Sequence, residues 1–357
     1  MKILILGGTG VMGNFLVNLL SPENEIYVTS RRQRVSKNNI TYIQGNAHNF
    51  SFFTRTLDLF FWDCIIDFMH YSTEEFKNRY LYILKSTKQF IFISSSRVYA
   101  DCTNRILETS PRLLEMTKDR QFLKTDDYAL AKARQEDLLL NSKYKNYTII
   151  RPYMTYYSQK LDLGFYPKEL WLKRVIEGKA IIFPKNICDK YTTLTSGYDV
   201  ALGIKSIIGK DSALGEIFHI TQNRSIKWQD VLNIYKDELK KHGISMKCIY
   251  IENDDCYSYI NWYDRQYNRQ FNNDKINQYL PIEKFTDTPK GLSNSLDEFL
   301  QNIHYTKIDW RFYAHWDRIT KETTKLKNIP GLKNKFVYLF FRYTIPYPSL
   351  KKIKYIF

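Results

Sequence analysis

Lys2-Ile-Leu-Ile-Leu6 and, directly after it, Gly7-Gly8-Thr9-Gly10-Val11-Met12-Gly13 stand at the start of the chain. An apolar run, a glycine-rich turn and a helical pattern over 14–20 form the strand–turn–helix context of a dinucleotide-binding fingerprint. Glycines in this turn allow the backbone to approach a pyrophosphate, and the helix N-terminus offers N–H groups to it. The stretch therefore predicts a cofactor site formed by Gly7, Gly10, Val11, Met12 and Gly13.

Similar apolar runs recur along the first 220 residues, and helical patterns such as those of residues 74–86 and 129–140 separate them. Because the early runs are continuously apolar rather than alternating, they indicate a parallel sheet covered on both faces. The alternation predicts an α/β fold, a doubly wound (Rossmann) sheet built from right-handed βαβ units. The expected strands are residues 3–6, 26–30, 40–44, 64–68, 90–94, 148–151 and 217–221.

The length of the chain predicts more than one compact region, because 357 residues exceed what a single hydrophobic core usually holds. The βα rhythm breaks after Arg151-Pro152, and the later sequence is helical and rich in aromatic residues. We expect an NAD(P)-binding Rossmann domain and a smaller, mostly helical substrate lobe. The Rossmann domain is expected over 1–155 with a return segment at 192–222, the substrate lobe over 156–191 and 223–329, and a basic aromatic tail over 330–357.

The composition excludes several classes of protein. A hydrophobic content of 44% argues against disorder, and no apolar run reaches membrane-spanning length. The five cysteines are scattered and form no Cys-x-x-Cys pair, which argues against a disulfide framework or a zinc site. The six histidines show no metal-ligand spacing, so no metal is expected. These features, with no signal peptide recognisable at the N-terminus, predict a cytoplasmic protein.

The last residues of the chain have a composition of their own. No acidic residue follows Glu322, whereas eight lysines and arginines do, and aromatic residues lie between them. This composition is typical of a segment in an anionic membrane interface. The alternative is that the aromatic side chains pack on the substrate lobe or on a partner subunit while the lysines face water.

The end of the second expected strand bears on the choice of cofactor. It reads Thr29-Ser30-Arg31-Arg32, whereas NAD-binding proteins usually place an acidic residue there to bind the ribose 2′-hydroxyl. Arginine accommodates a 2′-phosphate instead. We therefore expect Arg31 and Arg32 to favour NADP, with NAD as the alternative.

A candidate catalytic group follows the strand at 90–94. Ser94-Ser95-Ser96-Arg97-Val98-Tyr99 places hydroxyls at the carboxyl end of that strand, and Tyr128 and Lys132 share a helix face further on. An ammonium one helical turn from a phenol favours the phenolate and lowers its pKa from about 10. Such a phenolate can accept a proton from a substrate hydroxyl or return one to a ketone.

In these motifs the sequence resembles the extended short-chain dehydrogenase/reductase superfamily, in its nucleotide-sugar epimerase/dehydratase branch. The resemblance extends over about the first 220 residues, through Arg151-Pro152, Asp199-Val200-Ala201 and Gly215-Glu216-Ile217-Phe218. It implies that Ser95 orients the reacting oxygen, that Tyr128 transfers the proton, and that Lys132 tunes the phenol and holds the nicotinamide ribose. It further implies that Met69 lines the cofactor pocket and that the protein forms a homodimer.

One departure narrows the expected chemistry. Dehydratases of this branch carry an Asp-Glu pair where this chain has Ser96 and Arg97, so a 4,6-dehydratase is not expected. Arg97 could meet a substrate phosphate or carboxylate, or form a surface salt bridge.

The expected function is hydride transfer at a carbon of a nucleotide sugar, by an epimerase or a 4-ketoreductase. The net charge of +16 leaves open a second class, a nucleic-acid-binding or regulatory member of the superfamily.

Overall fold

The computed structural model of the chain describes residues 1–252 and 262–344 and divides into two compact units. Unit 1 comprises Met1–Thr155, Thr193–Arg224 and Gln270–Thr286, and unit 2 comprises Tyr156–Thr192, Ser225–Arg269 and Asp287–Phe357. Unit 1 thus includes residues 270–286, which the sequence pattern assigned to the substrate lobe.

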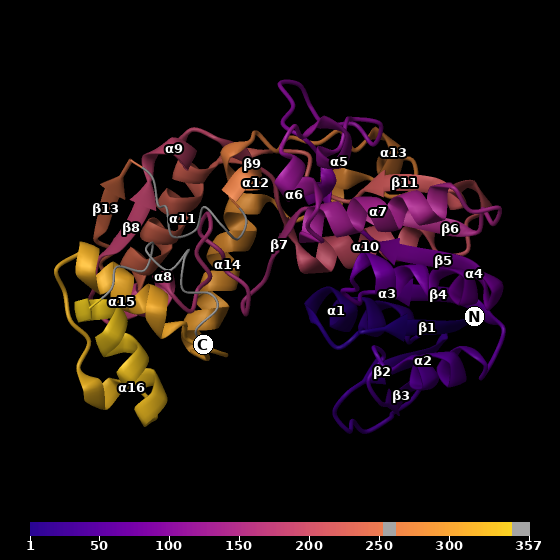
Figure 1. The fold of residues 1–357 in the computed structure, drawn as a ribbon, viewed down its shortest axis with the longest axis horizontal. Helices are drawn as coiled ribbons and strands as arrows, with labels where there is room; N and C mark the ends of the chain where they lie inside the picture. The colour runs from indigo at the N-terminus through magenta and orange to yellow at the C-terminus, as the bar shows by residue number, and fades with distance from the viewer. Residues whose placement is uncertain (253–261, 345–357) are drawn as a thin grey trace. The chain divides into compact units, whose positions relative to one another are not determined.

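Unit 1 is built on a seven-stranded parallel sheet, which confirms the predicted doubly wound α/β fold (Figure 1). The strand order is β11-β6-β5-β4-β1-β2-β3, so the chain reverses its direction of winding beside β1. In the centre, Ile3 pairs with Ile26 on one side and with Cys64 on the other. The strands are β1 (Lys2–Leu6), β2 (Glu25–Ser30), β3 (Ile40–Gln44), β4 (Trp62–Asp67), β5 (Thr87–Ile93), β6 (Tyr147–Arg151) and β11 (Glu216–His219).

Helices cover both faces of this sheet (Figure 1). Along β1, Ile3 and Ile5 pack in the cluster that contains side chains of α1 and α10, while Leu4 and Leu6 pack in the cluster that contains those of α2, α3, α4 and α7. Burial on both sides explains why the strand is apolar at every position. The helices of unit 1 are α1 (Val11–Leu20), α2 (Phe50–Leu57), α3 (Thr73–Lys77), α4 (Tyr80–Lys85), α5 (Leu113–Met116), α6 (Arg120–Leu123), α7 (Tyr128–Leu140), α10 (Gly197–Ile207) and α13 (Asp274–Asn277), with the short turns η1 (Ser96–Val98), η2 (Asp211–Ala213) and η3 (Ile282–Lys284).

Unit 2 is mostly helical, as predicted for the C-terminal part. Two small sheets accompany the helices: β8 pairs with β13 in parallel and β9 pairs with β12 antiparallel. Its core includes the stacked rings of Trp171 and Tyr235, whose centroids are 4.8 Å apart. The elements of unit 2 are α8 (Trp171–Ile176), β8 (Ile181–Pro184), α9 (Lys185–Cys188), β9 (Tyr191–Thr192), β12 (Ile226–Lys227), α11 (Trp228–Lys241), β13 (Cys248–Ile251), α12 (Trp262–Gln266), α14 (Thr288–Gln301), α15 (Trp310–Ile319), η4 (Leu326–Asn328), α16 (Leu332–Leu339) and the π-helical turn η5 (Phe340–Thr344). Two further short strands pair with each other: β10 (Leu194–Ser196), which belongs to unit 1, and β7 (Met154–Tyr156), which begins in unit 1 and ends at the first residue of unit 2.

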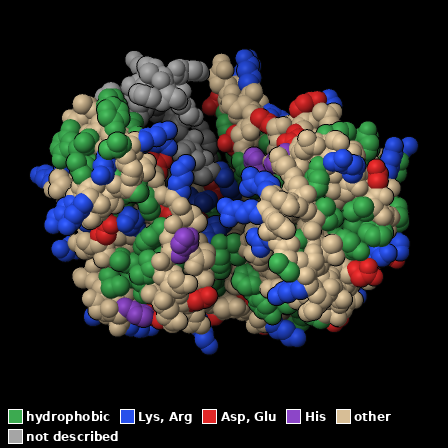
Figure 2. Space-filling view, turned by 90° about the horizontal axis from the view of Figure 1, so that it is seen from below, with side chains coloured by type: hydrophobic (Ala, Val, Ile, Leu, Met, Phe, Trp, Pro, Cys, Tyr) green, Lys and Arg blue, Asp and Glu red, His purple; other side chains and the backbone are tan. Residues whose placement is uncertain are grey.

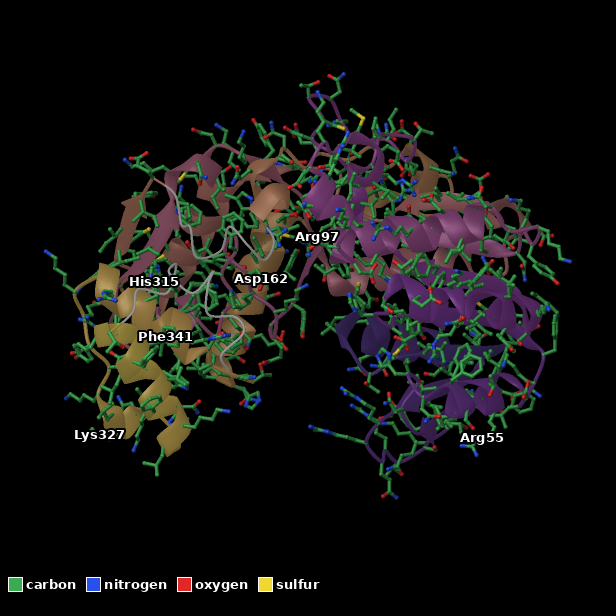
Figure 3. The ribbon with its side chains drawn as sticks, viewed as in Figure 1. Arg55, Arg97, Asp162, His315, Lys327 and Phe341 are labelled. Carbon is green, nitrogen blue, oxygen red and sulfur yellow. The ribbon has the colours of Figure 1, made fainter. Side chains whose placement is uncertain are left out.

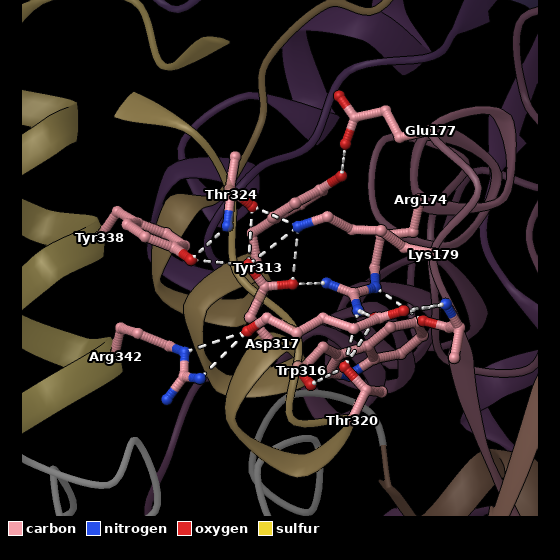
Figure 4. A network of polar contacts seen from close by, with 12 residues as sticks. Arg174, Glu177, Lys179, Tyr313, Trp316, Asp317, Thr320, Thr324, Tyr338 and Arg342 are labelled. Carbon is pink, nitrogen blue, oxygen red and sulfur yellow. Dashed lines mark hydrogen bonds and ion pairs between the residues drawn. The ribbon is translucent and has the colours of Figure 1, made fainter. Parts of the chain in front are cut away.

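A buried network of charges joins three helical segments of unit 2 (Figure 4). The Asp317 carboxylate of α15 accepts from Arg174 of α8 at 2.5 Å, from Lys179 at 2.9 Å and from the Tyr338 hydroxyl of α16 at 2.6 Å. Arg174 also donates to Glu322 at 2.7 Å. Because both Arg174 and Asp317 are fully buried, these contacts replace the water that each charge loses.

The predicted C-terminal tail of 330–357 is described only as far as residue 344. Tyr338 and Phe341 are buried, whereas Leu332 and Phe336 are 85% and 63% exposed. In the described ranges, each helix is too short or too polar to cross a membrane. Lys and Arg side chains lie scattered over the face of the protein that Figure 2 shows.

Candidate active site

The glycine turn after β1 requires glycine at two positions for steric reasons. Gly7 has a φ of +70°, and a Cβ there would lie 2.8 Å from the Met69 sulfur. A Cβ at Gly13 would lie 2.5 Å from the Gly8 carbonyl oxygen. The turn is held by the Gly7 N–H, which donates to the Thr29 hydroxyl at 3.0 Å. These contacts fix the turn between β1, β2 and the segment after β4.

The third glycine of the motif lies beside open space. A Cβ at Gly10 would meet no atom within 4 Å, and Gly10 begins α1 without any side-chain cap. The first N–H groups of a helix have no partner within the helix, so those at the start of α1, around Val11 and Met12, are available to a ligand. An uncapped helix N-terminus with free space in front of it has the chemistry that suits a pyrophosphate.

The end of β2 carries the two predicted arginines. Arg31 and Arg32 are both exposed, and the Ser30 hydroxyl donates to the Arg32 carbonyl at 2.7 Å. Residues 29–34 contain no carboxylate that would compete for the ribose 2′-hydroxyl. The end of β2 therefore carries two exposed guanidinium groups and no carboxylate.

The structure brings together the two predicted hydroxyls. Ser95 follows β5 and precedes η1, and its hydroxyl oxygen accepts from the Arg97 N–H at 3.2 Å. Tyr128 begins α7, where Asp127 caps the helix by accepting from the Ala129 N–H at 3.0 Å. The Ser95 side chain lies close enough to the Tyr128 phenol to act on its pKa. The carboxyl end of β5 and the first turn of α7 therefore place one serine and one phenol side by side.

The pKa of the Tyr128 phenol lies above its ordinary value because the phenol is buried. Two neighbours act in the opposite direction and lower it: the Ser95 side chain and the positive charge of Arg97. The Arg97 guanidinium carbon lies 5.2 Å from the centroid of the Tyr128 ring. The sequence predicted that Lys132 would be the cation acting on this phenol, but here that cation is Arg97.

Lys132 is instead held in the interior of unit 1. Its ammonium donates to the Ile93 carbonyl at 2.8 Å and lies 4.5 Å from the centroid of the Phe92 ring. Burial lowers the pKa of Lys132 to about 8, against the opposing influence of Asp67 and Glu136. Burial also raises the pKa of Asp67, at the end of β4, to about 6. The opposite charges of these two buried groups act on each other and partly offset the effect of burial.

Two residues after β4 complete the surroundings of the phenol. The His70 ring stacks on the Tyr128 ring with centroids 5.2 Å apart and planes inclined by 8°. Burial and the charge of Lys132 lower the pKa of His70, which favours the neutral ring. The Met69 N–H donates to Asp67 at 2.8 Å, and its side chain lies against Gly7. Met69 thus lies beside the glycine turn.

Comparison with known proteins agrees with this arrangement. The family model of the NAD dependent epimerase/dehydratase family matches residues 3–182, which is half of the chain. The chain belongs to this family. Its cofactor is accordingly NAD or NADP, and the glycine turn and the start of α1 fit such a dinucleotide.

Solved structures of low sequence identity share the fold. Pal from Bacillus thuringiensis is 18% identical, with a TM-score of 0.66 over 85% of this chain and 100% of that one. UDP-glucuronic acid 4-epimerase from Bacillus cereus in complex with NAD is 16% identical, with a TM-score of 0.65 over 85% and 98%. UDP-N-acetylglucosamine 4-epimerase from Methanobrevibacter ruminantium M1 is 14% identical, with a TM-score of 0.65 over 85% and 99%.

One curated relative is named for binding a stem-loop and not for an epimerase activity. The chloroplast stem-loop binding protein of 41 kDa b from Arabidopsis thaliana is 26% identical over 243 residues. The match covers 63% of this chain and spans 60% of the length of that relative.

Sequence reasoning overlooked Asp67 and underestimated Arg97. Asp67 ends an apolar strand, and a carboxyl at the end of a buried strand was a signal that could have marked it. Arg97 was recognised as unusual, but a surface salt bridge seemed as plausible for it as a site role. Only the folded chain shows the guanidinium beside the ring of Tyr128.

Proposed function

We propose that the protein is an NAD(P)-dependent nucleotide-sugar epimerase or 4-ketoreductase. The observation that carries the proposal is that Ser95 lies close enough to act on the pKa of the Tyr128 phenol, in the same unit as the glycine turn of β1. Ser95 follows β5 and the glycine turn follows β1 of the same parallel sheet, and ligands of such sheets bind outside the carboxyl ends of the strands.

Each residue has a defined task in this proposal. The nicotinamide supplies hydride chemistry at a sugar carbon, usually C4, when the cofactor is bound. Ser95 donates a hydrogen bond that orients the reacting oxygen, and Tyr128 removes the proton of the hydroxyl or returns it to the ketone. Lys132 supplies a buried positive charge behind the helix and is proposed to hold the nicotinamide ribose. We propose NADP as the preferred cofactor because Arg31 and Arg32 replace an acidic residue at the end of β2.

An epimerase and a ketoreductase would use these groups in the same way. In an epimerase, the carbon is oxidised and then reduced on the opposite face, and the cofactor stays bound. In a ketoreductase, one reduction occurs and the oxidised cofactor must leave. A dinucleotide that co-purifies with the protein would favour epimerisation.

The experiment measures turnover of UDP- and dTDP-sugars with NADP and with NAD, for the wild type and Tyr128→Phe. We expect turnover by the wild type, with NADP bound more tightly than NAD. In Tyr128→Phe we expect the rate of turnover to fall by about 10²- to 10⁴-fold, as is usual when an acid–base group is missing. Tyr82→Phe is the matched control, because Tyr82 is 52% exposed on α4. Equal activity of Tyr128→Phe and Tyr82→Phe would contradict the proposal.

RNA binding without turnover is a second candidate function. It is favoured by the name of the curated relative, a stem-loop binding protein, and by the net charge of +16. The same preparation, tested in a filter-binding assay with an RNA stem-loop, distinguishes the two classes. RNA binding together with no turnover of any nucleotide sugar would favour the second candidate.

We also propose that the C-terminal segment contacts an anionic membrane surface. Leu332, Phe336, Leu339 and Tyr343 recur at helical spacing and are exposed by 38% to 85%, and every charged residue after Glu322 is basic. We expect sedimentation with vesicles that contain phosphatidylserine but not with phosphatidylcholine vesicles, and its loss in Leu332→Ser/Phe336→Ser. No sedimentation of the wild type would refute this contact. A homodimer is likewise proposed, from the family resemblance alone.

A further inference from the structure

We infer that Arg97 binds a carboxylate of the substrate, next to the carbon that exchanges hydride. The sugar would then be an activated uronic acid. This inference rests on the proposed function, because it uses Tyr128 as the group that contacts the reacting oxygen.

The position of Arg97 is the first argument. Its guanidinium carbon lies 5.2 Å from the centroid of the Tyr128 ring, and its own backbone N–H donates to the Ser95 hydroxyl. Arg97 therefore belongs to the same short turn, η1, that presents the serine of the proposed catalytic pair. Figure 3 shows where this side chain lies on the ribbon. Any substrate oxygen that reaches both hydroxyls is brought close to this positive charge.

The second argument is that this guanidinium lacks a counter-charge. Its Nε is buried and has no hydrogen-bond partner, and no acidic side chain among residues 1–252 and 262–344 forms an ion pair with it. The salt bridge that the sequence left open is therefore not formed there. A partly buried charge without a partner costs free energy, which a bound anion would recover.

Other guanidinium groups in the interior of unit 1 show the contrast. Arg151 donates to both oxygens of Glu136, and Arg79 donates to two backbone carbonyls and pairs with Glu75. Arg112 pairs with Glu115, Glu136 and Asp137. The chain thus supplies oxygen acceptors to its structural arginines and leaves Arg97 without a carboxylate.

The chemistry of a pyranose suggests which anion Arg97 meets. The diphosphate is attached to C1, and C4 lies on the opposite side of the ring, so the diphosphate points away from a phenol that contacts the C4 oxygen. The substituents next to C4 are those of C3 and C5, and in a uronic acid C5 carries a carboxylate. The planar guanidinium matches a carboxylate with two parallel hydrogen bonds.

The test compares two pairs of nucleotide sugars that differ only at C6: UDP-glucuronate against UDP-glucose, and UDP-galacturonate against UDP-galactose. Affinities are measured by calorimetry on the protein saturated with dinucleotide. We expect the wild type to bind the acid of at least one pair about 10- to 100-fold more tightly, the range given by charge-assisted hydrogen bonds of roughly 1.5–3 kcal/mol. Arg97→Gln should abolish this preference, and Arg97→Lys should restore part of it.

Free UDP provides the control for the other anion of the substrate. If Arg97→Gln weakens the binding of free UDP as much as it weakens the binding of UDP-glucuronate, Arg97 binds the diphosphate and the inference is overturned. If Arg97→Gln leaves the preference for the acid unchanged and only shifts the pH dependence of turnover, Arg97 acts on the phenol and the inference is again overturned.

The result also separates the inference from the proposed function. Turnover of neutral nucleotide sugars that depends on Tyr128, without any preference for the acids, would refute the carboxylate and leave the proposed function standing. If the wild type neither binds nor turns over any of these four sugars, the inference is refuted; the proposed function is refuted as well if the wild type also fails to turn over dTDP-sugars.

Discussion

Two arginines of this protein, one in each unit, show how differently a chain can treat a guanidinium in its interior. Arg174 of unit 2 is fully buried and donates to Asp317 and Glu322 (Figure 4). Arg97 of unit 1 is partly buried and lies beside the Tyr128 ring without a carboxylate among the parts of the chain that the structure describes. The first arrangement is complete in itself, whereas the second becomes complete when an anion binds.

This difference distinguishes a charge that maintains the fold from a charge that is available to a ligand. A buried arginine whose partners come from several helices joins those helices, since each partner would be left uncompensated without it. An arginine without an acidic partner contributes little to the stability of the fold. The presence of Arg97 beside Tyr128 is therefore better explained by a ligand. Substitution of the two arginines by the same apolar residue should therefore lower the stability strongly in one case and barely change it in the other.

The largest effect is expected from Arg174→Met. This change leaves the buried Asp317 carboxylate without its main counter-charge, although Lys179 and Tyr338 remain in contact with it. We expect the free energy of unfolding to fall by about 3–5 kcal/mol, the usual result when one partner of a buried ion pair is removed. Urea denaturation followed by circular dichroism measures the change.

Arg97→Met is the matched variant in unit 1. Since no carboxylate is left unpaired and an uncompensated charge is removed, we expect the free energy of unfolding to stay the same or rise slightly, together with the loss of acid preference described above. A destabilisation as large as that of Arg174→Met would show that Arg97 maintains the fold and would remove the contrast.

Lys132, like Arg97, is a cation near the site, but it is packed in the core. We expect it to make the free energy of unfolding depend on pH, with a smaller effect than that of Arg174→Met. The pKa of Lys132 is lowered to about 8 in the folded protein, so above pH 8 the unfolded chain holds a proton that the folded chain has lost. The stability contributed by this group therefore rises with pH above about 8, by at most about 1.4 kcal/mol per pH unit.

Lys132→Met should remove this rise between pH 8 and 9, and Lys118→Met, at an exposed position, should retain it. Urea denaturation at the two pH values measures both variants. A rise that persists unchanged in Lys132→Met would mean that the ammonium is not held in the interior.

Local sequence predicted the elements that are determined by local chemistry. The apolar run predicts strand β1, the glycines predict the turn, and the helical pattern predicts α1. Each of these signals acts over only a few residues. The hydroxyls of Ser95 and Tyr128 were predictable because each follows a recognisable strand or begins a recognisable helix.

The features that the sequence did not reveal depend on contacts between distant residues. Residues 270–286 join unit 1 because Ile106 exchanges backbone hydrogen bonds with Gln270 and Asn272, more than 160 positions away. The sequence around Asp317 does not indicate that Arg174, more than 140 positions away, is its partner. Lys132 was expected at the phenol from its i, i+4 spacing, but the carbonyl of Ile93 holds its ammonium. Spacing along a helix defines a shared face and not the partner of the side chain.

The transfer of deuterium tests the central claim most directly. The wild type, saturated with NADP, is mixed with a nucleotide sugar that carries deuterium at C4. The reaction is quenched during the first turnover, before an epimerase returns the deuteride to the sugar, and the nicotinamide is analysed by mass spectrometry. The account predicts deuterium on the nicotinamide of the wild type and its loss in Tyr128→Phe, with binding of the sugar retained. A wild type that binds the sugar but transfers no deuterium from C4, or a Tyr128→Phe variant that transfers it at the same rate, would contradict the account.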